Sequence, residues 1–351
     1  MSIARGIRCW GVLALLAAPP CAFADPIPQS SAPLAATSAV PEQSEIAPLA
    51  SKSLLLDVAA AGTRIVVAGE RGEVLLSDDQ GATWRQPVTP TGSSLTAVYF
   101  VDPSHGWAVG HDAVILRTED GGEHWARVHF EPQASQPLLD VWFKDSDHGV
   151  AVGAYSAYFT SADGGRTWQS QTFSPVVNPA PRHAQTGKAA PAAEADDEGT
   201  QFHLNAISAS TNGKLYIAAE AGHLYRSDDG GATWLTLGSP YEGSFFGMLP
   251  LDGDSVLAFG MRGHLYRSDN AGSDWTEINT GVTAMLTSGA RLAHESVVIT
   301  GLAGVLLVSK DAGHTFSLQQ QADRKGMSSA LLAGERLITV GEGGVFIRTL
   351  Q

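Results

Sequence analysis

One eight-residue string recurs six times along the chain, and this repetition restricts the possible folds more than any other feature. Each copy opens with Ser or Thr, has Asp or Asn at its third position and Gly at its fifth, and ends in Trp or Phe. Recurrence with a period of about 40 residues is typical of repeat proteins. The copies follow one another at intervals of 41, 43, 66, 41 and 41 residues and begin at Ser77, Thr118, Ser161, Ser227, Ser268 and Ser309.

Apolar and polar residues alternate between the copies, as they do in β-strands. In the first unit, residues 54–59, 64–69 and 73–78 are predicted strands, and a fourth begins at Trp84. Short strands separated by turns rich in Gly, Asp and Asn form antiparallel hairpins. Four strands in a unit of about 40 residues are typical of a propeller blade. The sequence therefore predicts an all-β propeller of four-stranded antiparallel blades.

Seven blades account for the length of the chain. After the sixth copy, residues 327–349 supply three more strands, and a seventh copy does not follow. We expect the seventh blade to take its fourth strand from residues 43–49, because pairing the first and last segments would close the ring and leave no free edge. The seven-bladed propeller is expected to extend over residues 43–351.

Two parts of the chain fall outside this pattern. Residues 1–24 are predicted to be an export signal, because Arg5 and Arg8 precede a short apolar run and a cleavage pattern of small residues. Residues 25–42 are expected to be a flexible segment. Residues 174–199 lengthen the third interval and are rich in Pro and Ala with an acidic cluster, which predicts a disordered insertion.

The export signal determines the expected compartment. Its removal takes away Cys9 and Cys21, the two cysteines of the chain, so no disulfide or cysteine metal site is expected. A thiol-free protein suits an oxidising compartment, and we predict export to the periplasm or to an equivalent of the thylakoid lumen. Since no second apolar run of about 18 residues follows, we do not expect membrane insertion.

The charge of the chain excludes one class of partner. There are 22 Lys and Arg against 36 Asp and Glu, which gives a net charge of −14. Loss of the signal leaves 20 basic residues and lowers the net charge to −16. Nucleic-acid binding needs a basic surplus and is therefore not expected. The histidines are scattered singly, so no metal or other cofactor is predicted, and a monomer is expected.

We interpret the repeated string as structural, although it carries Ser, Asp and Thr. Each copy falls in the turn between the third and fourth strands, where an Asp carboxylate can accept backbone N–H bonds and a Trp can bury its ring. A catalytic group is needed once, whereas a structural turn is needed in every blade. The predicted structural residues are Asp79, Trp84, Asp120, Trp125, Asp163, Trp168, Asp229, Trp234, Trp275 and Asp311.

The units resemble the Asp-box, or BNR-like, repeat of sialidases and related propellers. Residues 100–125 and 143–168 are similar to a narrower group, the repeat of the Ycf48/HCF136 family. The shared features are a Phe, a turn with Gly, an Ala-Val-Gly strand end and the Asp-Gly-Gly-x-x-Trp box. The resemblance implies a seven-bladed, exported or lumenal propeller that assists photosystem II assembly and stability by binding newly made reaction-centre protein rather than by catalysis.

Two functions from different classes remain open. The leading interpretation is a non-catalytic, exported protein-binding scaffold or assembly factor whose client is a membrane or envelope protein. The alternative is an Asp-box glycoside hydrolase or carbohydrate-binding protein, which would need arginines around a Tyr and Glu in the central pocket. Arg64 is expected to be a surface residue at a strand end, and Tyr225 and Tyr266 recur in two blades. We therefore assign no catalytic residue.

A partner is expected to bind where the blades differ from one another. The turns between the second and third strands share one face of a propeller, and their residues vary from blade to blade, unlike the repeated box. Arginine in these turns can pair with a carboxylate or stack on a ring. The candidate partner-binding residues are Arg71, His111, Tyr155, Glu220, Arg262 and Glu342.

Overall fold

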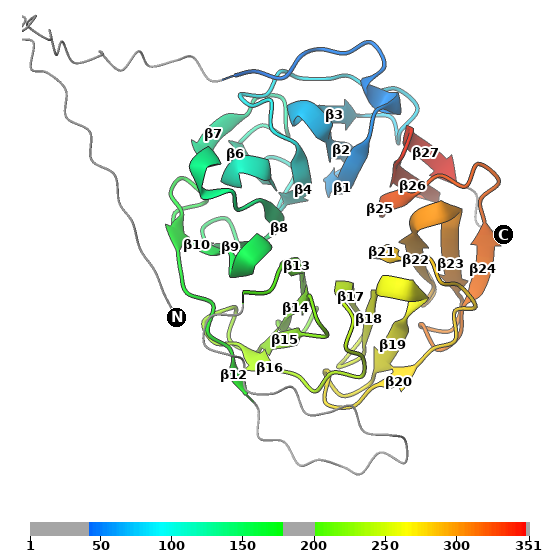
Figure 1. Ribbon diagram of the computed structural model, residues 1–351. Helices are drawn as coiled ribbons and strands as arrows, with labels where there is room; N and C mark the ends of the chain where they lie inside the picture. Colours follow the sequence, from blue (N-terminus) through cyan, green and yellow to red (C-terminus); the bar gives the residue numbers. More distant parts are fainter. Residues whose placement is uncertain (1–41, 178–200, 349–351) are drawn as a thin grey trace, which may run out of the picture. The chain divides into compact units, whose positions relative to one another are not determined.

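The computed structural model describes residues 42–177 and 201–348, which form a ring of seven β-sheets (Figure 1). The prediction of an all-β, seven-bladed propeller is confirmed. Besides strands, the described residues contain single-turn 3-10 helices. These are η1 (Ala50–Lys52), η2 (Glu70–Gly72), η3 (His111–Ala113), η4 (Pro132–Ala134), η5 (Ala154–Ser156), η6 (Met261–Gly263) and η7 (Leu302–Gly304).

The first three blades are antiparallel sheets that follow one another along the chain. Blade 1 contains β1 (Leu55–Ala61), β2 (Arg64–Gly69) and β3 (Val74–Ser77). Blade 2 contains β4 (Leu95–Phe100), β5 (Gly106–Gly110), β6 (Ile115–Thr118) and β7 (Ala126–His129). Blade 3 contains β8 (Leu138–Phe143), β9 (Gly149–Gly153), β10 (Tyr158–Ser161) and β11 (Gln169–Ser170).

The remaining four blades complete the ring. Blade 4 contains β12 (Val176–Val177), β13 (Leu204–Ala209), β14 (Leu215–Ala219), β15 (Leu224–Ser227) and β16 (Leu235–Thr236). Blade 5 contains β17 (Phe245–Pro250), β18 (Val256–Gly260), β19 (Leu265–Ser268) and β20 (Thr276–Glu277). Blade 6 contains β21 (Leu286–Arg291), β22 (Val297–Gly301), β23 (Val305–Ser309) and β24 (Ser317–Gln320), and blade 7 contains β25 (Met327–Ala333), β26 (Arg336–Gly341) and β27 (Gly344–Arg348).

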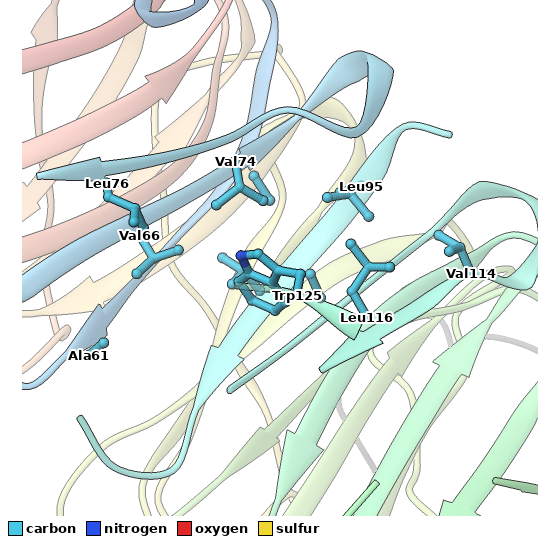
Figure 2. Packing of buried hydrophobic residues seen from close by; sticks show 11 residues of the cluster. Ala61, Val66, Val74, Leu76, Leu95, Val114, Leu116 and Trp125 are labelled. Atoms are coloured by element: carbon cyan, nitrogen blue, oxygen red, sulfur yellow. The ribbon is translucent and has the colours of Figure 1, made fainter. Parts of the chain in front are cut away.

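The hydrophobic core lies between neighbouring blades. The second strands β5, β9, β14, β18 and β22 are buried along their whole length, because a blade packs on each face of these sheets. Figure 2 shows one of these layers, in which Trp125 of blade 2 packs with Val66 and Leu76 of blade 1. These strands carry apolar side chains on both faces because each lies between two neighbouring blades. A sheet with one face in solvent would show alternating apolar and polar residues instead.

The first strand of each blade lies nearest the centre of the ring (Figure 1). Each of these strands has a β-bulge near its start, such as the register shift between Leu55 and Asp57. A bulge leaves one residue unpaired and bends the strand, which re-aims the side chains beside it. The bulges thus decide which side chains face the centre.

The predicted closure by an N-terminal strand is wrong. Residues 43–49 form no strand, and the sheet of blade 7 contains β25, β26 and β27 within the described part of the chain. Residues 44–47 instead bond to the outer segment of blade 1, through Ser44 N–H to the Thr89 carbonyl at 3.0 Å and Ala47 N–H to Gln86 Oε1 at 2.9 Å. Ala47 and Ala50 pack in the hydrophobic cluster between blades 7 and 1.

The insertion begins with ordered residues, which corrects the predicted boundary. Val176 and Val177 of β12 pair in parallel with β16 of blade 4, so residues 174–177 do not all belong to a disordered segment. Residues 178–199 of that prediction lie outside the described residues, as do the predicted export signal and most of the flexible segment 25–42. In the two described stretches, no helix is long and apolar enough to span a membrane.

Candidate binding face and the opposite box face

The turn between the second and third strands makes the same backbone hydrogen bond in every blade. The first residue of the turn donates its backbone N–H to the carbonyl of the residue just before the first strand of the same blade. In blade 1, Glu70 donates to the Leu54 carbonyl at 3.1 Å. We call the face formed by these seven turns the turn face. The second residue of each turn has a positive φ, and these residues are Arg71, Asp112, Tyr155, Ala221, Arg262, Ala303 and Gly343.

Four of the six candidate residues project from the turn face. Arg71, His111, Tyr155 and Arg262 are exposed, and the Arg71 side chain is 77% accessible. Within the described residues, Arg71 forms a single, long ion pair with Glu70, at 3.9 Å. These residues stand on blades 1, 2, 3 and 5, so the fold places them on one face but distributes them around the ring rather than in one cluster.

The two acidic candidates already bind backbone groups of their own chain. Glu220 accepts the His203 N–H at 3.0 Å, and Glu342 accepts the Gly326 N–H at 3.0 Å. Both acceptor bonds fix the start of a first strand. These glutamates therefore hold the turn face together, and the groups most available to a partner are the arginines and the apolar side chains.

The turn face also carries exposed apolar side chains. Tyr155 is 49% exposed, Met261 is 40% exposed and Leu302 is 38% exposed. The Tyr155 ring also contacts the His203 ring edge to face, with centroids 4.9 Å apart. Aromatic and arginine side chains are the residue types enriched in protein-binding hot spots. Sequence reasoning found Tyr155 but did not single out Leu302.

On the opposite face lie the six copies of the repeated eight-residue string, which we call boxes. Each box is held by hydrogen bonds among its own residues. In the first box, Asp79 Oδ1 accepts the Thr83 N–H at 2.8 Å, and Asp79 Oδ2 accepts the Thr83 hydroxyl at 2.6 Å. Ser77 donates to the same carboxylate and accepts the Gly81 N–H, both at 2.8 Å. These bonds, led by the one from the Thr83 hydroxyl, lower the pKa of Asp79 to about 2. We call this side of the ring the box face.

The other boxes repeat this arrangement. Bonds from the Thr167 amide and hydroxyl lower the pKa of Asp163 to about 2, and in the fifth box the Asn270 side chain accepts the Asp274 N–H at 2.9 Å. The box Trp side chains pack against the blades, and the Trp125 indole donates to the Gly122 carbonyl at 2.9 Å. Every polar atom named here has a partner within its own box, as expected of a structural turn.

Arginines between the blades were missed by sequence reasoning. Arg117 of blade 2 donates to the Gly164 carbonyl of the third box at 2.6 Å and to Glu119 at 2.5 Å. Arg64, expected to be a surface residue, donates to the Gly121 carbonyl of the second box at 3.0 Å. We call such residues interblade arginines. They are Arg64, Arg117, Arg226, Arg267 and Arg336.

The centre of the ring is a pocket of about 230 Å³ lined by side chains of the first strands. Several of these side chains bond to the next blade: Asp57 accepts the Val98 N–H at 2.9 Å, and Asp140 accepts the Ile207 N–H at 2.8 Å. Its described lining contains no Arg, Tyr or Glu. The groups that a sialidase-like site would need therefore do not meet there.

The two carboxyls of the central pocket have raised pKa values. Desolvation by the surrounding ring raises the pKa of Asp57 to about 6. Desolvation, together with the negative charge of Asp57, raises the pKa of Asp140 to about 7. Sequence reasoning did not select either residue, although both follow the same Leu-Leu pair, at residues 55–56 and 138–139. Among the described residues, no group of three or more His, Cys, Asp or Glu could hold a metal ion.

The chain is similar to known proteins in sequence and in fold. The family model described as photosynthesis system II assembly factor YCF48 matches residues 83–135 and 128–294. The photosystem II stability/assembly factor HCF136, chloroplastic, of Cyanidioschyzon merolae (strain NIES-3377 / 10D) is 38% identical over 87 residues. That match covers 23% of this chain and spans only a fifth, 20%, of the relative's length.

Solved structures share the propeller over most of its length. The structure described as YCF48 bound to D1 peptide has a TM-score of 0.64 and 19% identity, and covers 88% of this chain and 96% of its own. Virginiamycin B lyase from Staphylococcus aureus has a TM-score of 0.67 and 10% identity, with 87% and 96% covered. At these identities the likeness establishes the fold alone.

Proposed function

Because the chain belongs to the family of photosynthesis system II assembly factor YCF48, we propose that it binds a segment of a membrane-protein client through its turn face. Membership confirms the resemblance seen in residues 100–125 and 143–168. The proposed role is that of a non-catalytic assembly factor, which acts in the periplasm or in an equivalent of the thylakoid lumen.

The single observation that carries the choice of face is the exposure of Arg71, Tyr155 and Arg262 at left-handed turn positions. The backbone there is fixed by hydrogen bonds, so these side chains are presented on a rigid support. A rigid aromatic or arginine anchor loses little conformational entropy on binding. The solved structure of YCF48 bound to a D1 peptide supports a peptide segment as the occupant.

The net charge of the molecule favours a protein as the partner. The chain has an excess of acidic residues, with a net charge of −14, and is repelled by anionic lipid and nucleic acid. Association with a membrane therefore runs through a protein client. The client is expected to offer carboxylates to Arg71 or Arg262 and an apolar side chain to Tyr155 and its neighbours.

Crosslinking in the exporting cell tests this proposal. The wild type, an Arg71→Glu/Arg262→Glu variant and a box-face control, Arg166→Glu/Lys310→Glu, are each purified with their partners. We expect the turn-face variant to recover less of a membrane protein, while the control recovers as much as the wild type. Equal recovery by all three proteins would remove the turn face from consideration.

The same samples separate the proposal from an enzymatic function. Purified protein is assayed with sialosides and other glycosides, and with Asp57→Asn and Asp140→Asn variants as controls. We expect no turnover, because each carboxylate already accepts a backbone N–H bond from the neighbouring blade. Turnover that disappears in either variant would contradict the non-catalytic role.

A further inference from the structure

Among the gaps that face one of the six boxes, the gap between blades 3 and 4 lacks an interblade arginine in the described part of the chain. In blades 2, 4 and 5, an interblade arginine stands just before the box and pairs with an acidic residue two positions later, as Arg117 does with Glu119. Blade 3 has Thr160 and Ala162 at these two positions. The Gly230 carbonyl of the fourth box, which would accept from that arginine, has no arginine partner among the described residues.

This double replacement opens a cleft of about 380 Å³ between the two blades. We call it the 3–4 cleft. Gly231 shows the effect on packing, because it is half-buried, whereas the glycine at the same position of each of the other five boxes is buried. The cleft is lined by Trp142, Lys144, His148, Gly149, Val150, Thr160, Ser161, Ala162, Asp163, Thr167, Gln169, Gly230, Gly231 and Ala232.

The cleft presents a cation beside an apolar wall. The Lys144 ammonium has no hydrogen bond or ion pair with any described residue, and its Nζ lies 3.8 Å from the position that a Cβ would take at Gly230. His148 is held through Nδ1 by Asp145 at 3.0 Å. Trp142 and Val150 supply the apolar wall.

The carboxylate in the lining is already occupied. Asp163 accepts bonds from the hydroxyls of Ser161 and Thr167 at 2.9 and 2.7 Å, and it forms no ion pair with Lys144. A guanidinium from a partner could not form the ion pair seen in blades 2, 4 and 5, because Ala162 replaces the acidic residue. Lys144 would also repel it. Lys144 is therefore a cation of the lining that no described carboxylate contacts, and it can pair with an anion.

We propose that the 3–4 cleft binds a carboxylate carried on a short apolar stem, supplied by a protein as an acidic side chain or as its free C-terminus. Lys144 pairs with the carboxylate, the Thr160 hydroxyl donates to it, and the stem packs against Trp142. This site lies on the box face and goes beyond the proposed function, which uses the turn face. Its failure would leave the turn-face proposal intact.

Titration with small probes tests the chemistry of the cleft. Mature protein labelled with ¹⁵N-tryptophan is titrated with 4-methylpentanoate and, separately, with 4-methylpentanamide. We expect the Trp142 indole resonance, assigned through Trp142→Phe, to shift saturably with the acid and not with the amide. Peptides with a free C-terminal Leu, and amidated peptides with an internal Glu, distinguish the two sources of the carboxylate.

Three variants locate the binding. Lys144→Met should weaken the affinity for the acid at least about tenfold, since a charged partner is lost. Thr160→Arg/Ala162→Asp should abolish binding by restoring the pair found in other blades, with an unchanged or higher melting temperature. Lys310→Met, at an exposed lysine of the sixth box, should bind as the wild type does. Equal shifts with acid and amide, binding that survives in Lys144→Met, or no saturable shift with any probe would overturn the proposal.

Discussion

Arg117 shows how a single side chain joins two blades. Its guanidinium reaches the Gly164 carbonyl of the next box and is only 11% exposed, while its charge is paired with Glu119. The boxes were predictable because they repeat at a constant spacing. The interblade arginines could not be predicted, because they do not repeat at one position: Arg64 and Arg336 come from second strands and the other three from third strands. Their acceptors are backbone carbonyls, which leave no signal in the sequence.

Replacement of Arg117 measures what this contact contributes. Arg117→Met keeps much of the apolar stem but leaves the buried Gly164 carbonyl with one donor, the Trp107 indole at 3.2 Å. We expect the free energy of unfolding to fall by about 1–3 kcal/mol in urea titrations. Arg166→Met, whose side chain is 60% exposed and pairs with the same Glu119, should change it by less than about 0.5 kcal/mol. Equal effects of the two changes would contradict an interblade role.

At the scale of elements, the hairpins of each blade followed from the sequence and the ring closure did not. The outer segment of blade 1 pairs only through the bridge between Leu76 and Arg85. Pro87 and Pro90 lack the N–H that a longer ladder requires. The N-terminal residues bond to this irregular segment instead of extending blade 7. Hydrophobic alternation indicates which residues form strands, but it does not determine which edge a non-repeated segment joins.

Removal of the N-terminal segment tests its role in stability. A protein that begins at Ala50 lacks the bonds of Ser44 and Ala47 to blade 1, and the packing of Ala47, that a protein beginning at Glu42 retains. We expect the shorter protein to melt about 2–3 °C lower, because one or two kcal/mol shifts the melting temperature of a domain of this size by a few degrees. Calorimetry that finds the same midpoint for both proteins would show that residues 42–49 do not contribute.

For the whole molecule, the number of blades could be predicted, whereas the groups that meet at the centre could not. Seven blades follow from the repeat length. The central lining depends on the bulge in each first strand and on bonds between blades, such as the Thr96 hydroxyl to the Leu138 carbonyl at 2.7 Å and the Thr287 hydroxyl to the Met327 carbonyl at 2.6 Å. Asp57 and Asp140 belong to this set of bonds around the ring.

These two carboxyls make the stability of the ring depend on pH. Their pKa values are raised from 3.8 to about 6 for Asp57 and to about 7 for Asp140. Because these pKa values are raised in the folded state, the unfolded protein loses the two protons at a lower pH than the folded protein does. The stabilisation from the two carboxyls is therefore complete below about pH 4 and is lost as the pH rises through 6 to 7. The box carboxylates act in the opposite direction, since the pKa of Asp79 is lowered to about 2 and their contribution is lost as the pH falls from about 4 to 2.

Asp140→Asn isolates the contribution of the central pair. The amide oxygen can still accept the Ile207 N–H, and the neutral amide brings no desolvated charge into the pocket. We expect the free energy of unfolding of the wild type to fall by roughly 1–3 kcal/mol between pH 5 and pH 8, and that of the variant to fall by distinctly less. Asp252→Asn, at an exposed carboxylate paired with Arg291, should keep the wild-type pH dependence. Urea titrations at the two pH values measure all three slopes, and parallel slopes for the wild type and Asp140→Asn would show that this carboxyl does not titrate within the folded ring in that range.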